Sequence, residues 1–444
     1  MERAYKRIGW LTLGLVVIPL TFASAQPRCD PLPAPSGPVI EVEPTQSGSL
    51  RGIVASAAAG TTILLHSGLY DMSHGDANSR LVFDTAGVTL RSFDGDRDSV
   101  VLDGAYQTNE LVSIHASDVT IASLTLRRAY DHPIHVSGTS GNPISGILLH
   151  DLEITDPGQQ AIKINAIDDG YADDGVVECS HIELTPQGRS QVRDNCYTGG
   201  IDAHAARGWS VRGNHIEGFW CDNGLSEHGV HFWRASRDTL VEQNVILNCA
   251  RGIGFGLGEQ GGSRIYVDDP YPEVSDKGHI DGLIRNNFIA VADPGLQSSA
   301  SGFDVGIGLE QSHGTVVVHN SVVSSQQPSS SSIEWRFPAT SAEIVNNLVS
   351  HNLKQRDGGV AALGGNISSA PLAWFQSLVL GDLHLISAGV GAVGAGSILA
   401  PGQAERDFDG DLRGIPRDVG ADEFGRIFAD GFEGGDLSAW SGAQ

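Results

Sequence analysis

Residues suited to acid–base chemistry recur in a five-residue pattern along the middle of the chain. The pattern is SIHAS, PIHVS, AIKIN, GIDAH, GVHFW, GIGFG, GIGLE and SIEWR between residues 113 and 336. Side chains alternate between the two faces of a strand, so the positions one and three places after the first Ile or Val share the outward face. These positions form two predicted columns: His115, His135, Lys163, Asp202, His231, Gly254, Gly308 and Glu334, and Ser117, Ser137, Asn165, His204, Trp233, Gly256, Glu310 and Arg336.

The first column predicts a catalytic series. If the strands stack in parallel, Lys163, Asp202 and His231 lie about 4.8 Å apart and touch in that order. β-Elimination from a uronide needs a cation on the carboxylate, a base for the C5 proton and an acid for the leaving oxygen. Lys163 or Arg336 could neutralise the carboxylate. His231 or His204 could be the base, with Asp202 orienting His231. These five residues are the predicted catalytic residues.

Aromatic and polar residues around this series predict a carbohydrate groove. Trp233 could stack on a sugar ring, and the glycine positions of the columns would let a ligand approach the backbone. The longest interval between repeats contains an excess segment, 259–278, which is predicted to wall the groove. The alternative is an ion ladder that only stabilises the stack, with His228 a buried structural imidazole. The predicted substrate-binding residues are His135, Asn165, Trp233, Arg234, Glu310, Glu334, Arg264 and Tyr266.

An acidic loop suggests a metal site. Asp168, Asp169, Asp173 and Asp174 crowd one loop close to Lys163 in the sequence. Carboxylate oxygens are the ligands that Ca²⁺ prefers. We therefore expect no required cofactor, with Ca²⁺ as the candidate ion; the alternative is a solvated acidic turn.

The elements that would position these residues come from a repeat. Nine segments share an aliphatic residue, a polar or small residue and a second apolar residue, and they begin 27 to 43 residues apart. Self-similarity at this period indicates a solenoid. From the fifth copy the central residue is always Asn, which predicts an Asn ladder between coils. The segments begin at Val88, Val119, Ile147, Val177, Val211, Val241, Ile284, Val317 and Ile344.

Apolar and polar residues alternate with a period of two, Gly and Asn residues separate the segments, and long helical patterns are lacking. These features indicate strands. The fold class is therefore all-β, a right-handed parallel β-helix of about ten coils with a short N-terminal capping helix. The pattern resembles the pectate lyase-like superfamily over residues 60–424, including AGTTILLHSGLYDM near the start and DFDGDLRGIPRDVGADEF near the end. In the related polysaccharide lyases this same sheet holds the substrate, so the resemblance implies a polysaccharide or oligosaccharide partner.

The N-terminal residues predict that the protein is exported. Three basic residues among the first seven precede an apolar stretch and small residues at 23–25, the pattern of a cleavable secretory signal peptide. The stretch is shorter than the ~20 residues of a membrane span. We expect a secreted or periplasmic monomer without membrane insertion. The predicted parts are a signal peptide 1–25, a Pro-rich lead-in 26–46, a β-helix domain 47–424 and a tail 425–444.

The net charge limits the classes of binding partner, and the cysteines predict disulfide bonds. The 28 Lys and Arg against 53 Asp and Glu give a formal charge of −25, which argues against nucleic acid or an anionic membrane surface. A polyanionic substrate would need a local basic strip or a divalent cation. After export the cysteines would meet an oxidising compartment. Cys179, Cys196, Cys221 and Cys249 predict one or two disulfides, and Cys29 is expected to be unpaired.

Three functions are compatible with these residues. The first is a polysaccharide lyase that acts on a uronate-containing glycan. The second is an inverting glycoside hydrolase, because Glu310 and Glu334 would lie about 8 Å apart on neighbouring coils, inside the inverting window. The third is a non-catalytic β-helix that binds glycan or acts as an adhesin.

Overall fold

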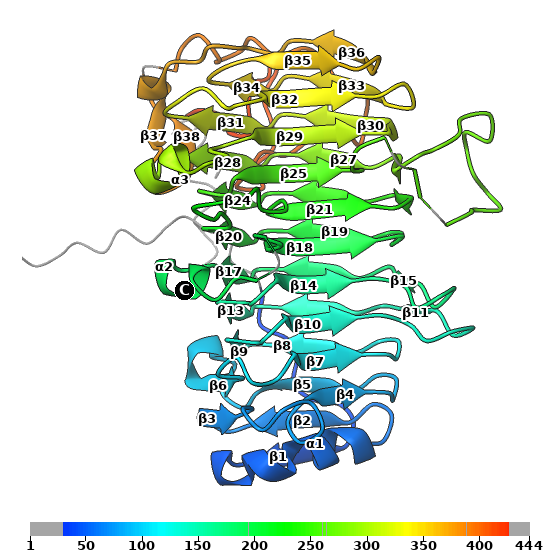
Figure 1. Cartoon of the computed structure of the whole chain (residues 1–444). Coiled ribbons are helices and arrows are strands. Elements are labelled where there is room, and N and C mark those ends of the chain that lie inside the picture. Colours follow the sequence, from blue (N-terminus) through cyan, green and yellow to red (C-terminus); the bar gives the residue numbers. More distant parts are fainter. Residues whose placement is uncertain (1–29, 194, 260, 263, 388, 426–444) are drawn as a thin grey trace, which may run out of the picture.

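The computed structural model describes residues 30–193, 195–259, 261–262, 264–387 and 389–425. The chain winds into a tall stack of coils, and three sheets run along the stack (Figure 1). The predicted signal peptide, Cys29 and nearly all of the predicted tail lie outside the described residues. Within the described residues, no helix is both long and apolar enough to cross a bilayer.

Each coil contributes strands to three sheets, here named sheets A, B and C. Sheet A contains β1 (Val39–Val42), β2 (Thr62–Leu65), β5 (Thr89–Ser92), β8 (Thr120–Ala122), β12 (Leu148–His150), β16 (Val176–Glu178), β19 (Ser210–Arg212), β22 (Ser236–Arg237), β23 (Leu240–Glu242), β26 (His279–Ile280), β27 (Leu283–Arg285), β30 (Ser312–Val318), β33 (Ser341–Val345) and β36 (Val360–Gly364). Sheet B contains β3 (Gly68–Asp71), β6 (Val100–Asp103), β9 (Thr125–Arg127), β13 (Glu153–Thr155), β17 (His181–Glu183), β20 (His215–Glu217), β24 (Val245–Leu247), β28 (Phe288–Val291), β31 (Ser321–Ser324) and β34 (Leu348–Val349).

Sheet C is the sheet on which the predicted catalytic columns lie. It contains β4 (Leu81–Phe83), β7 (Glu110–Ile114), β10 (His132–Val136), β14 (Gln160–Ile164), β18 (Gly199–His204), β21 (Val230–Trp233), β25 (Arg251–Phe255), β29 (Val305–Glu310), β32 (Ser331–Arg336) and β35 (Leu353–Arg356). Sheets B and C have ten strands each among the described residues, in agreement with the predicted number of coils. The strands pair in parallel, and in sheet C Ile162 aligns with Ile201, which in turn aligns with Val230.

Several short strands and helices lie outside sheets A, B and C. β11 and β15 form a two-stranded parallel sheet, and β37 and β38 pair antiparallel. Their bounds and those of the helices are β11 (Ile144–Ser145), β15 (Ala172–Asp173), β37 (Phe375–Ser377), β38 (Asp382–Leu385), α1 (Ser47–Ser56), α2 (Pro186–Arg189), α3 (Pro294–Ser298) and the 3-10 helices η1 (Pro44–Gln46), η2 (Arg97–Ser99) and η3 (Leu372–Trp374).

The core of the coils is a column of aliphatic side chains. Ile162, Ile201, Val230 and Ile253 face inward from successive strands of sheet C and are fully buried. Burying such side chains supplies roughly 1.5–3 kcal/mol each. The residues between them on each strand therefore point to the outer face, which confirms the predicted alternation.

The predicted capping helix is confirmed. α1 lies at the N-terminal end of the stack (Figure 1) and buries Leu50 and Val54. Its place over the first coil covers an end that would otherwise expose core side chains and unpaired strand edges. β1 lies inside the segment predicted as a lead-in and pairs in parallel with β2, so sheet A begins before residue 47.

The C-terminal segment does not continue the coils. Beyond β36 it packs against the outer face of sheet B, where Phe375, Leu383 and Phe408 form a buried cluster with Leu247 and Phe288. Figure 1 shows β37 and β38 beside β28, β31 and β34. The last part of the predicted β-helix domain is thus a flank layer on the solenoid.

The predicted Asn ladder is confirmed and continues one residue further. Asn287 Nδ2 donates to Asn320 Oδ1 at 2.9 Å, and Asn287 Oδ1 accepts from the backbone N–H of Asn244 at 3.1 Å and from Asn244 Nδ2 at 2.9 Å. Each amide also donates to carbonyls of its own and the preceding coil. The ladder contains Asn214, Asn244, Asn287, Asn320, Asn347 and Asn366.

Removing one rung should destabilise the fold strongly. Asn287→Ala leaves the buried backbone N–H of Asn244 without its acceptor and removes the side-chain donor to Oδ1 of Asn320, and buried unpaired polar groups cost about 1–3 kcal/mol each. We expect the free energy of unfolding, measured by denaturant titration, to fall by about 3 kcal/mol. Asn223→Ala, at an exposed position, is the control and should change it by less than about 0.5 kcal/mol. Equal effects at both positions would contradict the role of the ladder.

Candidate functional site on sheet C

The predicted stacking order of Lys163, Asp202 and His231 in the first column is confirmed. Lys163 pairs with Asp202, and Asp202 pairs with His231, on the adjacent strands β14, β18 and β21. One member of the column was placed wrongly. His135 pairs with Ser113, so His115 lies two residues further along the strand, in line with the second column. The pentamer SIHAS has Ile114 as its first aliphatic residue, whereas Val112 is the residue that aligns with Ile134.

A buried charge cluster connects the two columns. Lys163 Nζ donates to Asp202 Oδ2 and also contacts Tyr197 Oη at 3.3 Å. His204 Nε2 lies 3.1 Å from Asp202 Oδ2 and 2.9 Å from Lys163 Nζ. Trp233 Nε1 donates to Asp202 Oδ1 at 2.8 Å. Asp202 is thus the common acceptor of the cluster.

Loops cover this part of the outer face. Lys163 is 6% exposed, Asp202 1% and His231 0%, so the column is not open to solvent as a bare sheet would be. The covering loops are joined by a disulfide between Cys196 and Cys221, and Glu227 N–H donates to Thr198 O at 2.8 Å. The partly exposed members of the cluster are Tyr197, His204 and Trp233.

The cluster shifts the pKa values of its members in opposite directions. Asp202 is fully buried, which by itself would raise its pKa, but Lys163 and the hydrogen bonds from His204 and His231 hold that pKa well below its usual range. Burial lowers the pKa of His204, against the opposing effect of Asp202. His204 is therefore neutral at neutral pH and has a lone pair available. Burial also raises the pKa of the Tyr197 phenol.

His231 differs from His204 in both charge and access. Burial would lower its pKa, but Asp202 and Glu227 outweigh that effect and raise the pKa to about 9. Its ring is stacked against Trp233, with centroids 5.5 Å apart and planes at 3°, and its Nε2 lies 3.0 Å from Gly256 O. A fully enclosed and protonated imidazole is poorly placed to take a substrate proton.

Other predicted binding residues border the cluster. Arg234 is exposed, and its guanidinium carbon lies 4.8 Å from the Trp233 ring centroid. His135 Nε2 lies 2.9 Å from Asn165 Oδ1, and its Nδ1 lies 2.6 Å from Glu110 Oε1. These side chains extend the polar face along the outer side of β10, β14 and β21.

A pocket of ≈ 220 Å³ lies farther along sheet C, next to β25, β29 and β32. In it Arg336 Nη1 lies 3.1 Å from Glu310 Oε1, and Arg356 Nη1 lies 3.0 Å from Glu334 Oε2. Burial raises the pKa of Glu334 against the effect of Arg356. The lining residues are His228, Arg251, Gly256, Leu257, Asp304, Val305, Gly308, Glu310, Ser330, Glu334, Arg336 and Arg356.

The glycines of the columns have different roles. A Cβ on Gly254 would come within 2.5 Å of His228 Nε2, and a Cβ on Gly256 within 1.6 Å of Glu310 O. Both positions are therefore filled by the protein itself. A Cβ on Gly308 would make only ordinary contacts at 3.5 Å or more. Of these three glycines, Gly308 is the one that leaves room for a ligand.

The segment 259–278 lies along the turns beside the sheet. Arg264 makes two hydrogen bonds to Asp173, at 2.7 and 2.6 Å, and one to Ala205 O at 2.7 Å. Tyr266 is 8% exposed and donates to Ala235 O at 2.7 Å. Figure 1 shows the loop projecting from the side where the turn of β15 lies. Both predicted binding residues are thus engaged in fixing the loop.

The four aspartates proposed for Ca²⁺ do not gather into a ligand set. Asp173 is paired with Arg264, and Asp169 Oδ1 accepts from Gly141 N–H at 2.6 Å. Neither Asp168 nor Asp174 joins a metal-like cluster among the described residues. The residues present therefore do not fit Ca²⁺ at this loop. Three other groups of potential ligands exist in the described structure: His181, His215 and Glu217; Glu227, His228 and His231; and His384, Asp409 and Asp422.

The cysteine pattern is partly as predicted. Cys196 and Cys221 form a disulfide, Cys179 is also disulfide-bonded, and Cys249 is a buried free thiol among the described residues. Sequence reasoning did not single out Tyr197, although it lies one residue after Cys196. It also assigned no role to Glu227.

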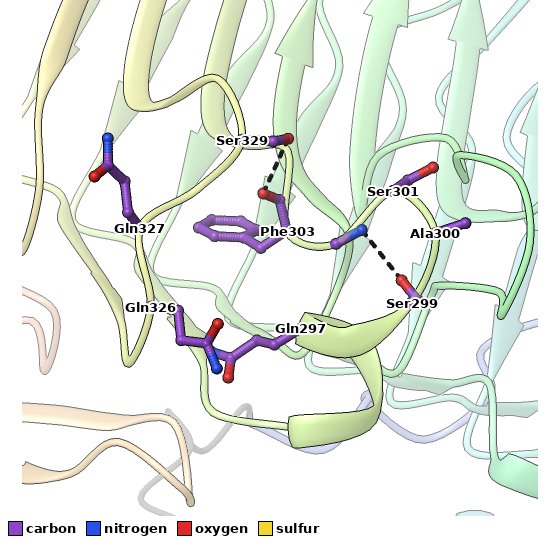
Figure 2. Close-up of a pocket in the computed structure, with 9 residues that line it drawn as sticks. Gln297, Ser299, Ala300, Ser301, Phe303, Gln326, Gln327 and Ser329 are labelled. Atoms are coloured by element: carbon purple, nitrogen blue, oxygen red, sulfur yellow. Dashed lines mark hydrogen bonds between the residues drawn. The ribbon is translucent and has the colours of Figure 1, made fainter.

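A second pocket of ≈ 220 Å³ lies away from these residues. Figure 2 shows Phe303 between Gln326 and Gln327 on one side and the residues around Ser301 on the other. The lining side chains are neutral, and no acid, base or cation among them lines the space. This pocket is therefore not a candidate catalytic site.

Comparison with known proteins gives structural matches. No protein family profile matches the chain, and no curated protein sequence matches it. An alginate lyase from Paenibacillus sp. str. FPU-7 superposes with a TM-score of 0.52 at 17% identity, over 73% of this chain and 99% of that chain. The pectate lyase Pel9A superposes with a TM-score of 0.50 at 13% identity, over 87% and 96%. The predicted fold is confirmed: the protein is a right-handed parallel β-helix, the fold of these two lyases.

The Cys196–Cys221 disulfide should stabilise the loops over the cluster. It closes a loop with a sequence separation of 25, for which the chain-entropy relation gives about 3.5 kcal/mol. The double variant Cys196→Ser/Cys221→Ser should lower the free energy of unfolding by about that amount. Denaturant titration measures it. A reductant should then destabilise the native chain more than the variant, and an unchanged midpoint in the variant would contradict the expectation.

The Glu110–His135 pair should make stability depend on pH in acid. Burial would raise the pKa of Glu110, but His135, Ser113 and Arg80 lower it from 4.5 to about 2. The stabilisation is therefore present above the unfolded value and is lost as the pH falls through about 2. It corresponds to about 3 kcal/mol. Glu110→Gln should flatten the acid limb of the melting temperature against pH; an unchanged limb would contradict the assignment.

Proposed function

We propose that this protein is a secreted carbohydrate-active enzyme, a polysaccharide lyase that cleaves a uronate-containing glycan by β-elimination on the outer face of sheet C. The observation that carries the proposal is the cluster around Asp202. It combines a neutral, partly accessible imidazole on His204 with a phenol on Tyr197 and an exposed cation on Arg234. The solved structures with this fold that are named as alginate and pectate lyases support the same class.

His204 is the proposed base. Its Nε2 has two partners and can donate to Asp202 or accept from Lys163. When Nε2–H donates to Asp202, Nδ1 presents the lone pair. Asp202 then stabilises the imidazolium that forms when the C5 proton is taken. The sequence left His231 and His204 as alternatives, and the burial of His231 favours His204.

The remaining steps use the groups beside it. Arg234 binds the uronate carboxylate and stabilises negative charge that develops at C5. The electron pair of the C5–H bond forms the C4–C5 double bond as the C4–O bond breaks. Tyr197 donates its proton to the leaving oxygen, and Lys163 Nζ, 3.3 Å from the phenol oxygen, stabilises the phenolate. The proton on His204 then passes to solvent.

Arg336 belongs to a different part of the groove in this proposal. It lies on β32, four strand spacings from His204 on β18, which corresponds to about 19 Å. One sugar unit cannot reach both. Arg336, Glu310 and Glu334 therefore form a distal subsite for the polymer.

A second candidate is the inverting hydrolase. Glu310 and Glu334 line the same pocket, and the raised pKa of Glu334 suits a general acid. Each carboxylate is already paired with an arginine, which makes this reaction the less favoured one. A glycan-binding protein without catalysis is the third outcome that the assay below separates.

Turnover with a panel of uronate glycans and neutral glycans tests these functions. A lyase produces unsaturated ends that absorb in the ultraviolet together with new reducing ends. A hydrolase produces reducing ends without that absorbance, and a binding protein produces neither. The second or third outcome would overturn the lyase.

Variants then test the residue roles. His204→Ala should lower kcat by about 10²–10⁴-fold, the usual contribution of a general base. Tyr197→Phe should lower kcat with the fold retained, and Arg234→Ala should raise KM and also lower kcat, because Arg234 both binds the carboxylate and stabilises the developing charge. His115→Gln is the matched control, because His115 lies in the same column of sheet C but outside the cluster. Unchanged kcat in His204→Ala would remove it from the mechanism.

A further inference from the structure

Three polar atoms beneath the covering loop have no well-aligned hydrogen bond, although His231 Nδ1 lies close enough to Glu227 Oε2, at 3.2 Å, for an ion pair. They are Glu227 Oε2, His228 Nδ1 and His231 Nδ1, and each is buried. The residues His228 and His231 are 5% and 0% exposed. Unpaired buried polar atoms are uncommon because each carries a desolvation penalty. A cation bound in place of the His231 Nδ1 proton would be a common partner for all three.

The atoms have the spacing of a coordination shell. Each of the three residues offers one ligand atom, and these atoms lie within 4.8 Å of one another. His231 Nδ1 lies 3.2 Å from Glu227 Oε2 and 3.4 Å from Asp202 Oδ1, and His228 Nδ1 lies 4.0 Å from Glu227 Oε2. An ion with tetrahedral bonds of about 2.0–2.1 Å keeps its ligand atoms about 3.3 Å apart. A small shift of the His228 ring would complete that arrangement.

Hydrogen bonds with neighbouring groups orient the side chains of His231 and Asp202. His231 Nε2 lies 3.0 Å from Gly256 O, so Nε2–H donates to that carbonyl. A bound metal would replace the Nδ1 proton that His231 carries in the metal-free protein, and Nδ1 would then be a ligand atom. Asp202 is fixed by Trp233 Nε1 and Lys163. Such outer hydrogen bonds orient the first ligands in metal sites.

The donor chemistry identifies the ion. Two imidazole nitrogens with carboxylate oxygens suit Zn²⁺, whereas Ca²⁺ takes six to eight oxygen ligands. The two carboxylates are balanced in the metal-free protein by Lys163 and by the proton on His231, and a cation that replaces this proton would balance the remaining negative charge. The other two candidate groups are less suited: His181 Nδ1 is bonded to Glu153, and both nitrogens of His384 are bonded to aspartates.

We propose that Glu227, His228, His231 and Asp202 form a zinc-type site that fixes the covering loop to sheet C. Four protein ligands make it a closed, structural site. Glu227 and His228 belong to the loop before β21, while His231 and Asp202 belong to β21 and β18. The ion would therefore hold the loop and the sheet together. This proposal does not depend on the proposed reaction.

Metal titration of the full secreted chain tests the site. The protein is stripped with a chelator, and Zn²⁺ and Ca²⁺ are titrated separately by calorimetry. We expect one Zn²⁺ per chain, a raised melting temperature, and no comparable uptake of Ca²⁺. Co²⁺ in place of Zn²⁺ should give the visible absorption of a tetrahedral site. Failure to bind Zn²⁺, or tighter binding of Ca²⁺, would overturn the proposal.

Ligand variants locate the ion. Glu227→Gln and His228→Gln should each weaken Zn²⁺ binding by more than about 100-fold, the upper end of what loss of an outer-shell partner causes. His215→Gln, in a different candidate group, should leave it unchanged. If His215→Gln instead abolishes binding and His228→Gln does not, the site is elsewhere and the proposal is wrong.

Two glycines give a matched pair that leaves every ligand in place. A Cβ on Gly254 would meet His228 Nε2 at 2.5 Å, whereas the nearest approach of a Cβ on Gly308 to His228 Nε2 is 3.9 Å. Gly254→Ala should displace the His228 ring and weaken Zn²⁺ binding by about tenfold or more. Gly308→Ala should not. Circular dichroism confirms that both variants are folded, and equal affinities would overturn the role of His228.

Discussion

The alignment of successive coils depends on the buried Asn ladder. Each ladder amide is enclosed, and its hydrogen bonds reach the coil before and the coil after it. A coil that slipped by one residue would leave these groups unpaired in the core and would turn its aliphatic side chains outward. Residues as distant in sequence as Lys163 and His231 can be near neighbours in space because this register holds.

The cluster around Asp202 shows what such alignment permits. A lysine, a carboxylate and two imidazoles are collected within hydrogen-bonding range beneath loops, where the low dielectric strengthens each interaction and penalises each unpaired charge. The same environment leaves His204 neutral and His231 protonated, although they lie on adjacent strands and share Asp202. The two residues are of the same type, so their different protonation states come from their surroundings.

Much of the fold could be predicted from the sequence. The period of the repeat, the alternation within strands and the recurring Asn indicated the coils, the ladder and the order Lys163, Asp202, His231. The two-residue displacement at His115 could not be seen, because Val112 and Ile114 are both aliphatic and each gives an acceptable inward position. Periodicity alone does not choose between them.

The environment of the site was less predictable. Nothing in the pattern indicates that the loops bearing Tyr197 and Glu227 fold over the column, since loop paths depend on long-range contacts such as the Cys196–Cys221 bond. The sequence likewise could not show that Arg264 would pair with Asp173, 91 residues away. That one ion pair removes Asp173 from the predicted calcium set and Arg264 from the predicted groove.

The flank layer after β36 has a mechanical consequence of its own. Its apolar side chains interlock with β24, β28, β31 and β34, so it spans several coils at once. Arg413 anchors it further by donating to Asn286 Oδ1 at 2.9 Å. A force that pulls on the C-terminal end of the described chain must therefore shear many of the contacts between the flank layer and sheet B at the same time. The terminal coil is protected from peeling away one strand at a time.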